Sequence, residues 1–256
     1  MTHFPESLIE LQSEQLACRR CSRLIEWCDA AAHNPPARFK GQTYHNGPVA
    51  SWGDVSSHLL IVGLAPAAHG ANRTGRLFTG DRSGEWLFRA LHRAGFASQP
   101  DSTHKGDGLE LRDCLISCAV RCAPPDNKPL PDELRACRPF LLQELQLLTQ
   151  LCVIVGLGKI GFDCAFDGLK EAGLTTLKAR PKFAHAACIE VAPQLYLLGS
   201  FHPSQQNTFT KRLTEPMLDA VFALANEKIA DASQATLGLP KSCNTTNTLS
   251  TTASPS

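Results

Sequence analysis

The sequence lacks the features that would assign a protein to a membrane, to secretion or to a broadly basic surface. Its formal net charge is only +1 over 256 residues, so any surface that binds a polyanion has to be local. No apolar run is long enough to span a bilayer. The polar, proline-interrupted residues 1–6 contain no secretory apolar segment. We therefore expect a cytoplasmic protein that does not bind a membrane.

Cysteine, by contrast, is abundant. The chain has 11 cysteines, and an odd number without a secretory segment argues against a disulfide scaffold and for thiols, some of them bound to metal. Cys18 and Cys21 form a C-x-x-C pair, and Cys122 and Cys137 form a wide pair around a proline-rich run. Four such thiolates can hold one iron–sulfur cluster, and Zn²⁺ is an alternative for the same ligands. Most of the other cysteines lie in or beside apolar stretches, where we expect core residues.

Alternating apolar runs and helical patterns predict an α/β fold. Four short apolar runs are typical of buried parallel strands, at residues 58–63, 114–120, 152–156 and 195–199. Helical spacing of apolar residues follows each run, at residues 83–94, 132–150, 158–172 and 212–230. Ser83 is the expected N-cap of the first of these helices. The alternation indicates a three-layer αβα architecture around a central four-stranded, mainly parallel sheet.

The two ends of the chain differ from this core. Residues 6–32 have helical spacing and carry the first cysteine pair, so they predict an N-terminal metal-binding helix. Residues 232–256 are rich in Ser, Thr, Asn and Pro and predict a disordered tail. We therefore expect a single domain over residues 1–231, followed by that tail.

Three polar loops follow the predicted strands, at residues 64–81, 121–131 and 200–207, and the carboxyl ends of such strands are where a ligand binds. In the first loop, Arg73 and Arg76 could bind phosphate, and Phe78 offers a flat apolar face for stacking. Asp81 is the only carboxylate of that loop. The alternatives are structural: Phe78 could belong to the core, and Asp81 could cap the next helix.

The other two loops each offer one polar group suited to recognition. His202 directly follows a strand, and a neutral imidazole there can donate to a developing oxyanion. Asn127 can pair with a base edge through one donor and one acceptor, although it could equally belong to an ordinary turn. Lys211 is consistent with a phosphate contact or with a solvated helix start.

Three motifs together carry a family resemblance. They are GLAPAAHGANRTGR at residues 63–76, RCAPP at 121–125 followed by NKP at 127–129, and HPSxxN at 202–207. These motifs resemble the uracil-DNA glycosylase superfamily, and most closely its iron–sulfur branch, called family 5 or type b. The resemblance covers residues 18–224. It implies a 4Fe-4S cluster on the four cysteines of the two pairs, Cys18, Cys21, Cys122 and Cys137.

The resemblance also implies roles for the loop residues. Most of the superfamily has Asp or Asn at the third position of the first motif, where this chain has Ala65. This departure matches family 5 and makes family 4, with Glu in that motif, a poorer match. The resemblance implies Asp81 and His202 as catalytic residues. It further implies a base-binding set made of Ala65, Phe78, Asn127, His202 and Asn207, beside the DNA contacts expected from Arg73, Arg76 and Lys211.

The function implied is hydrolysis of the N-glycosidic bond of uracil, and of other deaminated bases such as hypoxanthine and xanthine, in single- or double-stranded DNA. We expect a monomeric, monofunctional repair enzyme of the bacterial cytoplasm or nucleoid that extrudes its target base. Two alternatives stay open. One is a catalytically weak iron–sulfur protein that binds damaged DNA, which the missing carboxylate at Ala65 permits. The other is a zinc-stapled hydrolase of free nucleosides or another small substrate.

Overall fold

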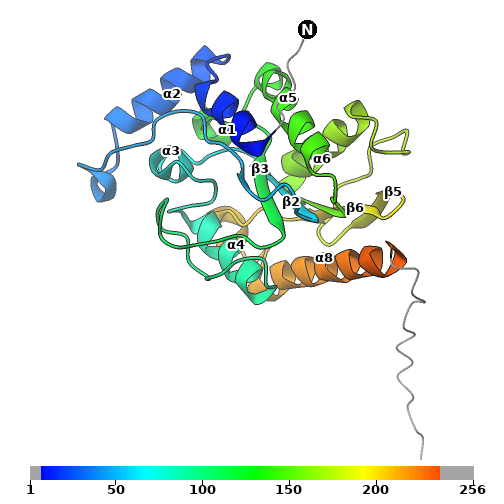
Figure 1. The fold of residues 1–256 in the computed structure, drawn as a ribbon. Coiled ribbons are helices and arrows are strands. Elements are labelled where there is room, and N and C mark those ends of the chain that lie inside the picture. The colour runs from blue at the N-terminus through cyan, green and yellow to red at the C-terminus, as the bar shows by residue number, and fades with distance from the viewer. Residues whose placement is uncertain (1–6, 237–256) are drawn as a thin grey trace, which may run out of the picture.

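The computed structural model describes residues 7–236 and has a six-stranded sheet at its centre, in the order β1-β3-β2-β4-β6-β5 (Figure 1). The four inner strands are mutually parallel: β2 (Leu59–Gly63), β3 (Cys114–Cys118), β4 (Val153–Leu157) and β6 (Leu195–Ser200). The edge strands β1 (Trp52–Gly53) and β5 (Cys188–Ala192) are antiparallel to their neighbours. The predicted α/β class is confirmed, and the sheet is larger than the four-stranded prediction by its two edges.

Helices cover both faces of the sheet, as expected for buried parallel strands. All five residues of β2 are buried. Leu59 and Ile61 point to one face, against α4 (Arg82–Arg93) and α8 (Glu215–Thr236). Leu60 and Val62 point to the opposite face, against α5 (Pro131–Leu147) and α6 (Gly158–Glu171). The alternation of side chains along each strand thus produces the predicted αβα layers.

The N-terminal segment forms two helices, so the prediction of one helix over 6–32 is wrong. They are α1 (Leu8–Ala17) and α2 (Ser22–His33). The chain leaves the helical conformation at Cys18, whose backbone is extended with φ −63° and ψ 132°. It re-enters a helix after Cys21. The break therefore places both cysteines of the C-x-x-C pair in the connection between the helices.

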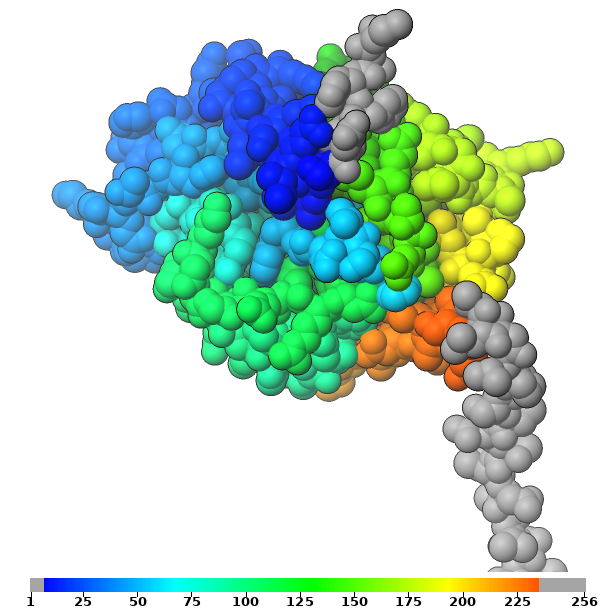
Figure 2. Space-filling model, viewed as in Figure 1, coloured from blue at the N-terminus to red at the C-terminus, as the bar shows by residue number. Residues whose placement is uncertain are grey.

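The N-terminal helices pack onto the protein where β3 ends. Leu11 of α1 is buried with Val120 and Phe140. The side-chain amide of Gln15 donates to Glu144 Oε1 of α5 at 2.8 Å, and its carbonyl accepts from Ser51 N at 2.9 Å. Figure 2 shows the N-terminal helices (blue) lying against the rest of the molecule on this face. This packing brings the segment of Cys18 and Cys21 to the strand end that leads to Cys122.

Helices α4 and α5 begin in different ways. The N-cap of α4 is Asp81 and not Ser83, because the Asp81 carboxylate accepts a hydrogen bond from Gly84 N at 2.9 Å. Helix α5 begins at Pro131, where a missing N–H costs nothing, and it continues through Pro139. The side chain of Glu133 accepts from Leu130 N at 2.7 Å and completes this start.

The remaining elements are short helices and 3₁₀ turns. They are α3 (Ala71–Thr74), α7 (Gln205–Phe209) and the 3₁₀ turns η1 (Ala37–Phe39) and η2 (Pro125–Asn127). Residues 232–236, which the sequence assigned to the disordered tail, continue α8, and the rest of that predicted tail lies outside the described residues. Within the described residues, no helix has the length and apolarity to cross a membrane.

The topology defines where the chain changes direction across the sheet. The connection after β2 leads to α4 on one face, whereas β4 leads directly to α6 on the other face. Strands β2 and β4 are neighbours. Their carboxyl ends therefore border the crevice in which α/β proteins of this kind bind their ligands.

Candidate active site and cysteine pocket

Two rings from distant parts of the chain lie close together at this crevice. Phe78, in the loop after β2, lies with its ring centroid 6.1 Å from that of His202, which follows β6, at an interplanar angle of 31°. Glycines make room for both rings. A Cβ on Gly63 would lie 2.7 Å from Phe78 Cζ, and one on Gly158 would lie 3.2 Å from His202 Cβ. The structure thus joins the first and last predicted loops around one place.

His202 is held as a neutral imidazole. Burial of the imidazole lowers the pKa of His202 to about 4, although the residue as a whole is only partly buried. The Asn207 side-chain amide donates to the backbone carbonyl of His202 at 2.8 Å, and Ser204 caps α7 by accepting from Asn207 N at 3.4 Å. A neutral imidazole retains one N–H, so His202 is a fixed hydrogen-bond donor at neutral pH.

Asp81 combines a structural contact with an unusual environment. One carboxylate oxygen caps α4 at Gly84, and the other faces Gly70, where a Cβ would be only 2.1 Å away. Burial raises the pKa of Asp81, and hydrogen bonds from the N–H groups of Gly84 and Ser83 oppose that rise. The carbonyl of Phe78 also packs against Gly84, 1.9 Å from the position of a Cβ there. Asp81 and Phe78 are therefore anchored at the same helix start.

Asn127 and Ala65 occupy different environments near the strand ends. Asn127 lies on the exposed turn η2 with φ +55°, and within the described residues its side chain makes no hydrogen bond. Its amide is therefore available to a ligand, although no contact joins it to Phe78 or His202. Ala65 packs against the apolar group that contains Val120 and Cys137.

The loop arginines are engaged within the fold. Arg76 is buried and pairs with Asp107, with Nη2 2.7 Å from Oδ2, so its guanidinium is not presented to solvent as a phosphate contact would require. Arg73 donates to three acceptors of its own fold, the carbonyls of His69 and Gly80 and the side chain of Gln42. Lys211 is exposed, and its side chain has no partner in residues 7–236. Of the three predicted DNA contacts, only Lys211 presents an uncommitted cation.

Sequence reasoning missed two groups beside the site. Phe209 of α7 has 68% of its surface exposed, and the Arg82 guanidinium lies 5.6 Å from the centre of its ring. This pair connects the start of α4 with the segment after His202. Asp107 was also missed, because its only sequence signal is an isolated carboxylate between glycines.

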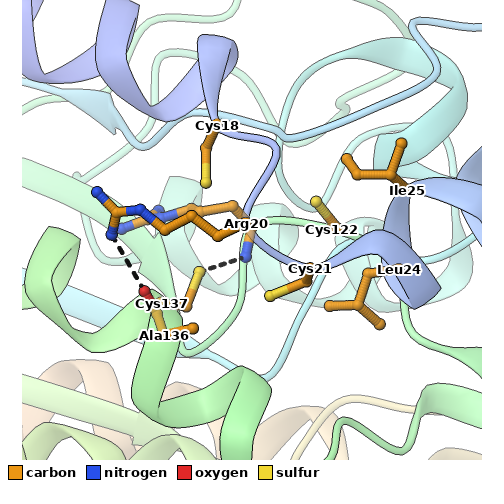
Figure 3. A pocket seen from close by; sticks show the side chains of 9 residues that line it. Cys18, Arg20, Cys21, Leu24, Ile25, Cys122, Ala136 and Cys137 are labelled. Carbon is orange, nitrogen blue, oxygen red and sulfur yellow. Dashed lines mark hydrogen bonds between the residues drawn. The ribbon is translucent and has the colours of Figure 1, made fainter.

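The four predicted metal ligands line one pocket. Cys18, Cys21, Cys122 and Cys137 surround it together with Arg20, Leu24, Ile25, Arg121 and Ala136 (Figure 3). The thiols come from the break between α1 and α2, from the loop after β3 and from α5. The backbone N–H of Arg121 donates to Cys137 Sγ at 3.2 Å. A fifth thiol, that of Cys28, lies beside the pocket and is hydrogen-bonded to Cys122.

The donor set of this pocket offers four soft ligands. Four thiolates can bind one Zn²⁺ or, with one thiolate on each iron, a 4Fe-4S cluster. Among the described residues, no group of three or more His, Cys, Asp or Glu side chains is arranged to hold a single metal ion. The four cysteines fit a cluster in number, softness and convergence on one pocket.

A buried polar network lies behind this pocket. Arg121 donates to Glu144 of α5 at 2.5 Å and to Ser117 of β3 at 3.0 Å, and all three side chains are buried. Glu144 also accepts from Gln15 of α1. A single carboxylate thus joins α1, β3 and α5. Cys18 directly follows α1, Cys122 lies in the loop after β3, and Cys137 lies in α5.

Comparison with known proteins shows the family to which this chain belongs. Residues 50–228 match the sequence model of the uracil DNA glycosylase superfamily, and the chain belongs to that superfamily. A Type-5 uracil-DNA glycosylase of Mycobacterium tuberculosis is 45% identical over 222 residues, which cover 86% of this chain and 81% of the relative. One of Thermus thermophilus is 45% identical over 203 residues, covering 78% and 89%.

Relatives of another type are more distant. A Type-4 uracil-DNA glycosylase of Thermotoga maritima is 29% identical over 157 residues, covering 61% of this chain and 69% of the relative. Within the superfamily, the chain is therefore a member of the type-5 family. This membership confirms the predicted family and the predicted class of enzyme, a glycosylase.

Proposed function

We propose that this protein hydrolyses the N-glycosidic bond of uracil and of other deaminated bases in DNA, without a lyase step. The observation that carries the proposal is that the Phe78 ring lies beside the neutral His202 imidazole at the crevice formed by the carboxyl ends of the strands. One group offers a stacking face and the other a hydrogen-bond donor. The names of the type-5 relatives support uracil in DNA as a substrate.

Binding requires that the target base leave the duplex, because its glycosidic bond cannot be reached inside the stack. The extruded base stacks on Phe78, with Ala65 on the neighbouring wall. The free side-chain amide of Asn127 recognises the base edge through one donor and one acceptor. Lys211 contacts a flanking phosphate, a contribution that weakens with salt.

Bond cleavage leaves negative charge on the departing base and positive charge on the sugar. The N–H of neutral His202 donates to the developing anion, and the Asn207 contact to the His202 carbonyl keeps the ring in place. A comparable oxyanion donor contributes about 3 kcal/mol, roughly a hundredfold in rate. Because a deaminated base is a good leaving group, the attacking water needs little activation, which makes Ala65 tolerable.

Asp81 is the candidate to orient the water and to stabilise the positive sugar. Its pKa is raised by burial, and one of its oxygens, Oδ2, lies beside Gly70. The motifs place no lysine as a Schiff-base nucleophile, because Lys128, the lysine of the second motif, is exposed at the end of the turn η2. The reaction therefore ends at an abasic site with an intact strand.

The cysteine quartet would hold a 4Fe-4S cluster, which supplies four covalent anchors between distant segments and no electron transfer in this reaction. Cys18 and Cys21 fix the N-terminal helices, and Cys122 fixes the loop that leads to Asn127. Cys137 fixes α5. The quartet is therefore structural in this proposal, and its contribution is the shape of the loop after β3.

The test is release of base from oligonucleotides that carry one uracil, hypoxanthine or xanthine, in single- and double-stranded form. We expect strand breaks only after alkali, and we expect His202→Ala to abolish most of the release while it retains the cysteine pocket. Breaks before alkali would contradict a monofunctional enzyme. Tight binding of uracil-containing DNA without release by the wild type would instead support a damage-binding protein.

A further inference from the structure

Phe78 has a backbone conformation that its surroundings have to enforce. Its φ of +53° lies in the left-handed region, which a bulky side chain rarely adopts. Its ring lies against Gly63 and its carbonyl against Gly84, so neither end of the residue can shift far. To keep this strained conformation, Phe78 needs contacts that fix the backbone on each side of it.

Arg76 supplies these contacts. Its Nε donates to Thr79 Oγ1 at 2.9 Å, and the same hydroxyl lies 3.2 Å from the carbonyl oxygen of Leu77. Leu77 and Thr79 flank Phe78 directly. One guanidinium therefore stabilises the chain immediately before and immediately after the strained residue.

Asp107 fixes Arg76 in turn. Arg76 Nη2 donates to Asp107 Oδ2 at 2.7 Å and to Ser102 Oγ at 2.9 Å, and the side chains of the ion pair are only 8% and 6% exposed. Although burial by itself raises it, the pKa of Asp107 is held well below its usual range by Arg76 and by the N–H groups of Thr103 and Leu109. The carboxylate is therefore charged at neutral pH.

The segment around Asp107 also contacts the loop after Phe78. Gly80 N donates to the carbonyl of Ser102 at 2.9 Å. The Arg76 guanidinium lies 4.8 Å from the centre of the Trp52 ring, which covers one side of it. With its charge neutralised and its donors directed inward, Arg76 acts within the fold.

We propose that the buried Arg76–Asp107 pair is a positioning device, which holds Phe78 so that its ring lies on Gly63 and faces His202. The proposal rests on the proposed stacking of a base on Phe78. Arg76 and Asp107 do not touch the substrate. They set the place of the one aromatic face that does.

A double-mutant cycle tests this coupling, with Asp107→Asn, Phe78→Leu and the two combined. We expect Asp107→Asn to lower the single-turnover rate constant by about tenfold or more, while the Kd for DNA changes by less than about threefold. In the Phe78→Leu background, the same change should cost less than about twofold, because the positioned ring is gone. Equal losses in both backgrounds would overturn the proposal. Asp219→Asn, which breaks the Arg93–Asp219 pair between α4 and α8, is the control and should leave the rate unchanged.

A readout independent of activity separates this inference from the proposed function. The Phe78 ring current acts on the nearby His202 imidazole, so the His202 ring resonances in NMR spectra report the position of Phe78. Asp107→Asn should move them toward their positions in Phe78→Leu, and the milder Ser102→Ala should move them part of the way if Asp107→Asn does not fold. Unchanged resonances would overturn the positioning role. A shift in a protein that releases no base would overturn only the proposed function.

Discussion

At the scale of the residue, burial decides the chemistry of His202. The Phe78 ring and the surrounding protein bury the imidazole, and this burial lowers the pKa of His202 to about 4. In an unfolded chain the same group titrates near about 6.5. Between these values the unfolded state binds a proton that the folded state does not bind.

This difference predicts a pH dependence of stability. The His202 contribution to the free energy of unfolding should be fully present above about pH 6.5 and should decline as the pH falls toward about 4. Denaturant unfolding of the wild type and of His202→Gln, measured at steps across this interval, isolates the contribution. A stability difference that stays constant across the interval would contradict the buried, neutral imidazole.

Two substitutions separate the role of Asp81 as a helix cap from the role of its carboxylate in catalysis. Asn is as good an N-cap as Asp, so Asp81→Asn should keep the thermal stability of the wild type, whereas Asp81→Ala should lose about 1 kcal/mol. If the carboxylate serves catalysis, both variants should slow single-turnover cleavage to a similar extent. Wild-type cleavage by Asp81→Asn would restrict Asp81 to its role at the start of α4.

Single residues were predictable where their position along a strand fixes their surroundings. His202 and Phe78 could be singled out because they follow buried strands whose ends share one edge of the sheet. The fate of Arg76 could not be predicted, since its partner lies 31 residues further along the chain and nothing local marks Asp107 as buried. A cation in a loop near a candidate site suggests phosphate until its internal partner is known.

At the scale of the element, the break between α1 and α2, the loop after β3 and helix α5 bring the four cysteines together. Cys122→Ala and Cys137→Ala should each lose most of the iron, against about four irons per chain in the wild type. Cys164→Ala is the matched control, because Cys164 is a buried thiol of α6 outside the pocket. Iron analysis with visible absorption gives the answer, and zinc in place of iron in the wild type would disprove the cluster.

The ion pair behind the pocket predicts a large effect on stability. Glu144→Ala leaves Arg121 as an uncompensated buried charge, which should lower the free energy of unfolding by about 3–5 kcal/mol. The exposed Arg82–Glu85 pair is the comparison, and Glu85→Ala should cost less than about 1 kcal/mol. Denaturant titration measures both, and similar losses would show that the buried pair is not the anchor of α1 and α5.

Elements with a strong apolar period were predicted, and those that depend on tertiary contacts were not. The four inner strands and the helices after them lie within a few residues of their expected positions. The two-residue strand β1 is too short to show alternation, and β5 lies half exposed at an edge. The helix break at Cys18 has no signal in apolar spacing, because Leu11 and Leu24 are buried on both sides of it.

At the scale of the whole molecule, the sheet topology explains why the motifs of a single chain meet. Strands β2 and β4 lie side by side, and their connections run to opposite faces, so the loops at their carboxyl ends border a common space. The sequence predicted that edge. It could not predict which cations face solvent there, because an arginine of these loops can pair with a distant part of the chain, as Arg76 does with Asp107.

One measurement tests the account most directly. A duplex oligonucleotide with a single uracil is mixed with an excess of the protein, and free uracil is measured over time for the wild type, Phe78→Ala and His202→Ala. We predict complete release by the wild type and a rate constant lower by about a hundredfold in His202→Ala, with a marked loss in Phe78→Ala. Wild-type rates in both variants would contradict a base that stacks on Phe78 and accepts a hydrogen bond from His202.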